Sequence, residues 1–301
     1  MSKFYKRILS PNRPDDPTLI DATGLWNTRD QKLAQASGIW PNGVIPTINY
    51  LVVGGGGGGG YVYIGAGGGG GGGAGGLITG SFGPTYNQPV SPYGYTLTIS
   101  VGGGGTGGTG PGAQGSNGSN SSVTGQYLNL IAYGGGGGGG GSSGTGSTGA
   151  NGGSGGGGSG GYPGFGSPTA GGSATQPSSI YGGYGNAGAF APDNHGGGGG
   201  GAGSAGSGQT SGAGLYVSIA NASSYSGTFA VGGSTITGSS TVPGSGAGPG
   251  SPSGETGKNG VIVLWWPTTY NKPTSITGTY TSSIENGYRI YKFTGAGSIR
   301  F

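Results

Sequence analysis

Short apolar segments alternate with glycine runs along the middle of the chain. The apolar segments are rich in β-branched and aromatic residues, a composition typical of β-strands. We therefore expect a mainly β fold with little helix. The predicted strands lie at residues 49–53, 61–64, 95–101, 126–133, 215–220, 227–231 and 261–266.

The two ends of the chain have ordinary sequence complexity. Residues 28–38 predict a short helix, because Thr28 and Gln31 fit a capping box and a glycine follows the last turn. Asn286 and Gly287 predict a hairpin turn between C-terminal strands. We expect three parts, namely an N-terminal attachment segment at 1–50, a glycine-rich body at 51–264 and a C-terminal β-strand cap at 265–301.

Glycine accounts for 87 of the 301 residues, whereas charged residues make up only 6%. Ordinary proteins contain about 7% glycine and about 25% charged residues, so an ordinary side-chain core is excluded for most of the body. A flexible linker is the simplest interpretation of a glycine run. The pure runs have similar lengths, however, which a linker does not require. They occupy residues 54–60, 67–73, 134–141 and 196–201.

A polyglycine II array accounts for the matched lengths. In this conformation the chain rises about 3.1 Å per residue with three residues per turn, and neighbouring chains can bond to each other when no Cβ separates them. Glycine also recurs at every third position within residues 112–118, 146–164 and 254–260. We predict a polyglycine II sandwich with the pure runs inside and the period-three runs outside. A collagen triple helix is the alternative, but the period breaks repeatedly and there are only 18 prolines.

The formal charge of +4 belongs to the two ends of the chain. Nucleic-acid binding needs clustered Lys and Arg, and the body has none, so we expect no nucleic-acid partner. The absence of cysteine excludes disulfides and Cys-ligated zinc. The first residues lack the apolar core of a signal peptide, and no stretch of about 18 apolar residues occurs. We therefore expect the protein to be made in a cytoplasm.

No group of side chains predicts catalysis. Asp193 and His195 could form an acid–base pair or part of a metal site, but the sequence PDNHG favours a turn leading into a glycine run. Glu255 and Glu285 lie in polar, turn-like segments and do not resemble a glycosidase pair. No phosphate-binding GxxxxGK[ST] motif occurs. We expect no enzymatic activity, no cofactor and no metal.

Two long segments of the body are rich in aromatic residues and form the candidate recognition loops. Tyrosine provides a large contact area at low entropic cost, and loops on a rigid support commonly carry binding residues. The alternative is that these aromatics only cover the ends of the slab. The candidate receptor-binding residues are Phe82, Tyr86, Tyr93, Tyr95, Tyr162, Phe165, Tyr181, Tyr184 and Phe190.

The segments YLVVGGGGGGG, LTISVGGGGTGGTG, LIAYGGGGGGGG and NGVIVLWWP resemble the repeats of glycine-rich tail-tip proteins of tailed bacteriophages. The ending GYRIYKFTGAGSIRF is similar to the closing strands of glycine-rich phage virion proteins, and GLWNTRDQKLAQASGIWP is similar to a segment of cyanophage tail proteins. The best known of these adhesins present variable loops on a sandwich of polyglycine II helices. The resemblance therefore implies a tail-fibre or tail-tip adhesin that resides in the virion.

The resemblance also implies partners. Trp26, Ile39 and Trp40 flank the predicted helix, and we expect them to contact other tail or fibre proteins. The loops would bind a host surface glycan or an outer-membrane protein, and homo-oligomerisation stays open. Two alternatives remain, namely a purely structural virion component and an antifreeze-type protein with spaced Ser and Thr.

Overall fold

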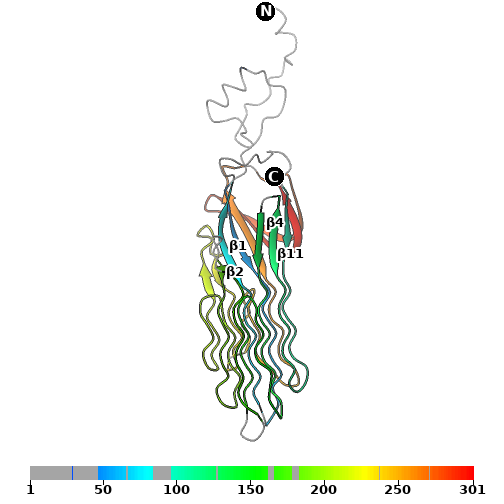
Figure 1. The fold of residues 1–301 in the computed structure, drawn as a ribbon. Helices are drawn as coiled ribbons and strands as arrows, with labels where there is room; N and C mark the ends of the chain where they lie inside the picture. The colour runs from blue at the N-terminus through cyan, green and yellow to red at the C-terminus, as the bar shows by residue number, and fades with distance from the viewer. Residues whose placement is uncertain are drawn as a thin grey trace, which may run out of the picture.

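The computed structural model describes residues 29, 47–65, 67–83, 96–126, 128–161, 166–177, 183–236, 238–270 and 272–301. These residues form an elongated body with two halves (Figure 1). Strands fill the half that contains the C-terminus, and extended glycine-rich segments fill the other half. The predicted helix at 28–38, apart from Arg29, and the attachment residues Trp26, Ile39 and Trp40 lie outside the described residues.

Every regular element in this described part is a β-strand, which confirms the predicted mainly β fold. The strands pair in antiparallel fashion throughout. They are β1 (Ile48–Val53), β2 (Leu77–Phe82), β3 (Thr96–Ser100), β4 (Ser121–Gly125), β5 (Leu128–Ala132), β6 (Gly183–Tyr184), β7 (Leu215–Val217), β8 (Gly227–Phe229), β9 (Val261–Pro267), β10 (Ser275–Glu285) and β11 (Tyr288–Arg300).

One sheet of nine strands is curved almost into a barrel by its long strand β11. β11 pairs with β9 through residues 288–293 and with β3 through residues 297–300, while β10 pairs with it along both stretches. Because a strand has only two edges, β9 and β3 share one edge of β11 and β10 takes the other. The β5-β4-β3 and β9-β1-β2-β6 parts are thereby folded toward each other, and β1 and β2 contact β5 across the interior.

Apolar side chains fill both faces of the central strands β1 and β9. Tyr50 and Leu264 belong to the core inside the curved sheet. Leu51 and Val263 belong to a second core outside it, where the two-stranded sheet β7-β8 packs. Burial on both faces explains why these strands appear in the sequence as continuous apolar runs, without the alternation of a strand that has one solvated face.

The C-terminal hairpin forms at the predicted turn. Asn286 and Gly287 have φ angles of 50° and 78°, the left-handed conformations that a type I′ turn requires. β9 runs across residues 264 and 265, where the sequence analysis placed a boundary, and β11 pairs with strands of the body. The C-terminal strands are therefore part of the same sheet as the strands of the body.

Two details of the strand predictions were wrong. Residues 61–64 form a turn with isolated bridges, at Tyr61 and Tyr63, and not a strand. The strands β2, β4 and β6 were missed. β2 contains Gly80 opposite Tyr50, and a Cβ at this glycine would lie 2.7 Å from the Tyr50 hydroxyl. A side chain at position 80 would collide with the Tyr50 side chain, so this position requires glycine. The glycine in turn weakens the strand pattern in the sequence.

The glycine runs form the predicted polyglycine II helices, and their hydrogen bonds repeat every three residues. In the run 54–60, the N–H groups of Gly54, Gly57 and Gly60 donate to residues 76, 73 and 70 at 2.8–2.9 Å. The N–H groups of residues 55 and 58 donate to residues 119 and 116, and those of residues 56 and 59 donate to residues 258 and 255. One helix therefore donates to three different neighbours in rotation, as three residues per turn requires.

The run 67–76 lies at the centre of the array. Its N–H groups donate to three helices, for example Gly70 to Gly139, Gly71 to Gly197 and Gly72 to Ala247. Its carbonyl oxygens accept from three more helices, at residues 54–60, 154–160 and 233. Six neighbours around one helix is hexagonal packing.

The outer helices show the predicted threefold exposure pattern. Along residues 102–109, Gly102, Gly105 and Gly108 are buried, whereas Thr106 and Thr109 are exposed. Outer asparagines complete bonds that glycine neighbours leave open. The Oδ1 atoms of Asn120 and Asn117 accept from the N–H groups of residues 134 and 137, each at 2.9 Å.

One part of the period-three prediction was wrong. Residues 154–161 fit the period but form an interior helix. This helix contains Ser154 and Ser159, which are fully buried. The hydroxyl of Ser159 lies 3.2 Å from the hydroxyl of Thr169, and that of Ser154 accepts from the N–H of Asn186 at 3.3 Å. Because a hydroxyl can replace a backbone hydrogen-bonding group, serine is tolerated inside the array.

Candidate functional site

The glycine helices end in a set of turns on the side of the array that lies away from the strands (Figure 1). Val53 leads directly from β1 into this array, while Ile48 at the other end of β1 pairs with Phe82. The turns therefore lie at the end opposite to the point where the chain enters the sheet. We call these turns the tip; they comprise residues 61–65, 109–113, 141–146, 191–196, 234–236 and 250–254.

Backbone hydrogen bonds join four of the tip turns to one another. The N–H of Tyr61 donates to the Ala113 carbonyl at 3.1 Å, and the Tyr61 carbonyl accepts from Gly141 at 2.8 Å. Val62 donates to Gly250 at 2.8 Å, which brings a fourth turn into contact. The turns at 61–65, 109–113, 141–146 and 250–254 are thus joined directly and are held by the helices beneath them.

Large apolar side chains project from this end of the molecule. Ile64 is 80% exposed, and Ile236 is 66% exposed. Phe190, one residue before the turn at 191–196, is 60% exposed. Gly65 has a φ of 87°, so the turn that carries Ile64 depends on a residue without a Cβ. An apolar side chain held out by a tight turn is suited to contact a partner.

The structure does not bring together the three recognition candidates that it describes, Phe82, Tyr184 and Phe190. Phe82 lies at the strand end, where its ring centroid is 6.0 Å from that of Tyr50. Tyr184 is half-exposed on the short strand β6, beside the sheet. Phe190 alone among the described candidates lies near the tip. Tyr86, Tyr93, Tyr95, Tyr162, Phe165 and Tyr181 lie outside the described residues.

Sequence reasoning missed Ile64 and Ile236 as candidate surface residues. Ile64 was assigned to a strand because YVYI has high β-propensity, although Gly65 directly after it signals a turn. Ile236 follows a glycine pair and precedes Gly238, whose φ is 77°. In both cases a positive-φ glycine marks the turn.

The ionisable residues singled out in the sequence do not form a reaction centre. Asp193 and His195 lie in an exposed turn, as predicted, in which the N–H of His195 donates to the Pro192 carbonyl at 3.0 Å. Glu255 lies on an outer glycine helix and Glu285 at the end of β10. Within the described ranges no group of three or more His, Cys, Asp or Glu side chains is placed to hold a metal ion.

Among the described residues no helix has the length and apolar character needed to cross a bilayer.

Comparison with known proteins gives no assignment, since no protein-family model matches the chain and no curated protein matches it either.

Proposed function

We propose that this chain is a virion tail-fibre or tail-tip protein that binds a host surface receptor through the tip. On this proposal the segment before residue 47 attaches to other tail or fibre proteins, and the glycine array holds the tip away from them. The observation that carries the proposal is the opposite placement of the chain entry and the connected turns. A protein that joins a virion to a cell needs its attachment and recognition surfaces at separate ends.

The composition of the tip favours recognition by shape and apolar contact. Ile64, Phe190 and Ile236 are exposed. The acidic and basic side chains in the described tip turns are those of Asp193 and His195. Rigid loops lose little entropy on binding, because the helices beneath already fix their ends. Such a surface suits sugar rings, which stack on aromatic faces, or the loops of an outer-membrane protein.

The test is a binding assay of the fluorescently labelled full chain on a panel of bacterial strains that includes cyanobacteria. A triple variant, Ile64→Ser, Phe190→Ser and Ile236→Ser, removes the apolar side chains of the tip. The matched control is Tyr216→Ser with Ile284→Ser, which removes two exposed side chains at 66% and 62% exposure from the strand half. We expect strain-selective binding by the wild type and the control, and loss of binding by the tip variant.

Equal binding by the tip variant and the wild type would contradict the proposal. A folded wild-type chain that binds no strain would instead support the purely structural role in the virion. Folding of each variant is checked by its thermal unfolding, so that loss of binding is not confused with loss of structure.

A further inference from the structure

Four Asn–Gly pairs lie in the described part of the chain. In such a pair the backbone nitrogen of the glycine can attack the side-chain amide of the asparagine, because glycine has no side chain to hinder the approach. All four asparagines are exposed, so exposure does not distinguish them. The pairs are Asn117–Gly118, Asn151–Gly152, Asn259–Gly260 and Asn286–Gly287.

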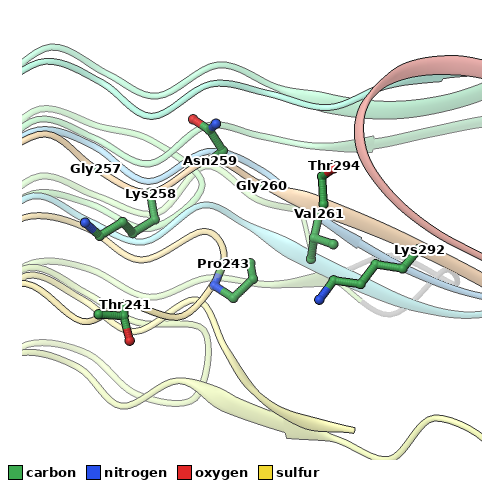
Figure 2. A pocket seen from close by; sticks show the side chains of 9 residues that line it. All are labelled: Thr241, Pro243, Gly257, Lys258, Asn259, Gly260, Val261, Lys292 and Thr294. Carbon is green, nitrogen blue, oxygen red and sulfur yellow. The ribbon is translucent and has the colours of Figure 1, made fainter. Parts of the chain in front are cut away.

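In the three pairs of the glycine array, hydrogen bonds hold both reacting groups. The Oδ1 atoms of Asn117, Asn151 and Asn259 accept from the N–H groups of residues 137, 173 and 104 at 2.7–3.0 Å. The N–H groups of the glycines that follow them donate to the carbonyls of residues 135, 173 and 102 at 2.8–3.3 Å. Figure 2 shows the Asn259 side chain extending from the last glycine helix, beside Gly260. Each pair is therefore bonded twice to one neighbouring segment.

The array also leaves no room for these glycines to turn toward the side chain. A Cβ added at Gly118, Gly152 or Gly260 would lie 2.1–2.2 Å from a backbone atom of another segment. At Gly287 the same Cβ would have no atom within 4 Å. The Gly287 N–H also makes no hydrogen bond within the described part of the chain. The nucleophile is thus free at this pair alone among the four.

The side chain of Asn286 is held through its nitrogen. Its Nδ2 atom donates to the carbonyls of Ala220 and Asn221 at 3.2 and 3.1 Å. These two bonds join the turn of the β10-β11 hairpin to the turn at 220–221, where Ala220 packs against the second core. The carbonyl carbon of the amide, which the glycine nitrogen attacks, stays accessible.

We propose that Asn286 is a site of spontaneous covalent modification, and that it reacts before the Asn–Gly pairs of the array. The Gly287 nitrogen forms a bond to Cγ of Asn286, its proton passes through water to Nδ2, and the Cγ–Nδ2 bond breaks with release of ammonia. Water then opens the resulting cyclic imide at either carbonyl, giving aspartate or isoaspartate. The net change replaces one ammonia by one water and needs no oxidant or cofactor.

The product changes a contact of the hairpin. A carboxylate has no N–H to donate, so it would face the carbonyl oxygens of Ala220 and Asn221 as a third acceptor. We expect the hairpin turn to separate from the turn at 220–221 as the protein ages. This inference goes beyond the proposed function and does not depend on receptor binding at the tip.

The test follows the folded full chain during incubation at mildly alkaline pH, with peptide mapping by mass spectrometry. Conversion of Asn286 should be at least about tenfold faster than conversion of Asn117, Asn151 or Asn259, because each of these must first break two hydrogen bonds. The same incubation in urea is the control. There the four pairs should convert at similar rates, since the structure that protects three of them is lost.

A variant tests the effect on the contact. Asn286→Asp creates the aspartate product directly, and hydrogen exchange at residues 219–222 should accelerate in it. Asn129→Asp is the matched control, because it adds the same charge at an exposed position of β5. Conversion of an array pair as fast as that of Asn286, an unreactive Asn286 in the folded chain, or the same order of rates in urea would overturn the proposal. Unchanged exchange in Asn286→Asp would overturn the predicted separation of the turns.

Discussion

Leu264 and Gly57 are both buried, one in the strand half and one in the glycine half, but different interactions stabilise their positions. Leu264 is buried among apolar side chains of the curved sheet. Gly57 has no side chain, and its N–H donates to Gly73 at 2.8 Å. Apolar burial stabilises the first half by about 25 cal/mol for each Å² removed from water, whereas the second half depends on backbone hydrogen bonds.

The comparison also indicates that the glycine half depends on the strand half. A backbone hydrogen bond contributes about 1 kcal/mol net, while fixing one residue costs about 1–2 kcal/mol and glycine loses the most freedom. Hydrogen bonds alone therefore do not offset the ordering of the array. The strands β1, β2, β3, β4, β5 and β9 each connect directly to a glycine helix, so their cores fix one end of those helices.

The largest predicted effect is that of a single methyl group inside the array. In Gly57→Ala the Cβ would lie 2.1 Å from the Gly136 carbonyl oxygen, so helices must separate and lose hydrogen bonds. We expect the free energy of unfolding to fall by about 4 kcal/mol or more, from overpacking and lost bonds together. Urea denaturation measures this change.

The matched control for this substitution is Gly103→Ala. Gly103 lies on a neighbouring outer helix and is exposed, and the nearest atom to its added Cβ is the Asn259 Oδ1 at 3.9 Å. We expect a change within about 0.5 kcal/mol. If both substitutions had the same effect, close backbone packing would not be what stabilises the glycine half.

A smaller effect tests whether the two halves unfold together. Leu264→Ala should lower the free energy of unfolding by about 3 kcal/mol, because it leaves a cavity in the core. Since β1 and β9 are continuous with glycine helices, we expect hydrogen exchange at Gly56 and Gly57 to accelerate. The opening free energy derived from it should fall by the same amount as the free energy of unfolding. Unchanged protection of these glycine amides would mean that the array is stable without the strands.

The smallest predicted effect concerns the pH dependence of stability, through one tyrosine of the strand half. Tyr291 stacks on Trp266 with ring centroids 5.1 Å apart, and its burial raises its pKa above the ordinary 10.0, an effect that Arg289 opposes and Tyr280 reinforces. Above pH 10.0 the unfolded chain loses this proton while the folded chain keeps it, so stability falls as the pH rises toward the folded pKa. Tyr291→Phe should lose less stability than the wild type between neutral pH and this range.

Urea denaturation of the wild type and of Tyr291→Phe, each at neutral pH and above pH 10.0, measures this difference. An identical alkaline loss in the variant would mean that another group governs it.

The glycine half could be predicted from sequence to an unusual degree, because its structure depends on backbone geometry and a threefold period. The exposure of Thr106 and Thr109 follows directly from their positions in that period. The exceptions have tertiary causes. Ser159 is buried because Thr169 lies within hydrogen-bonding distance of it, and that contact is not encoded in the local pattern.

The candidate site was less predictable than the fold. Phe82 and Phe190 are similar in sequence context, yet one packs beside Tyr50 at the strand end and the other is exposed near the tip. Which end a loop occupies depends on whether the preceding helix runs toward the strands or away from them. The direction of each helix can be deduced by counting the chain reversals that precede it. A strand that is not recognised in the sequence, such as β2, makes that count wrong.

The orientation of the hydrogen bonds in the array has a mechanical consequence. They run between helices, across the long axis of the molecule, from residues 54–60 to 70–76, 116–119 and 255–258. A force applied between the tip and residue 47 would act along that axis and load these bonds in shear. Many bonds must then break at once before one helix slides past another, so the glycine half resists tension far better than its lack of side chains suggests.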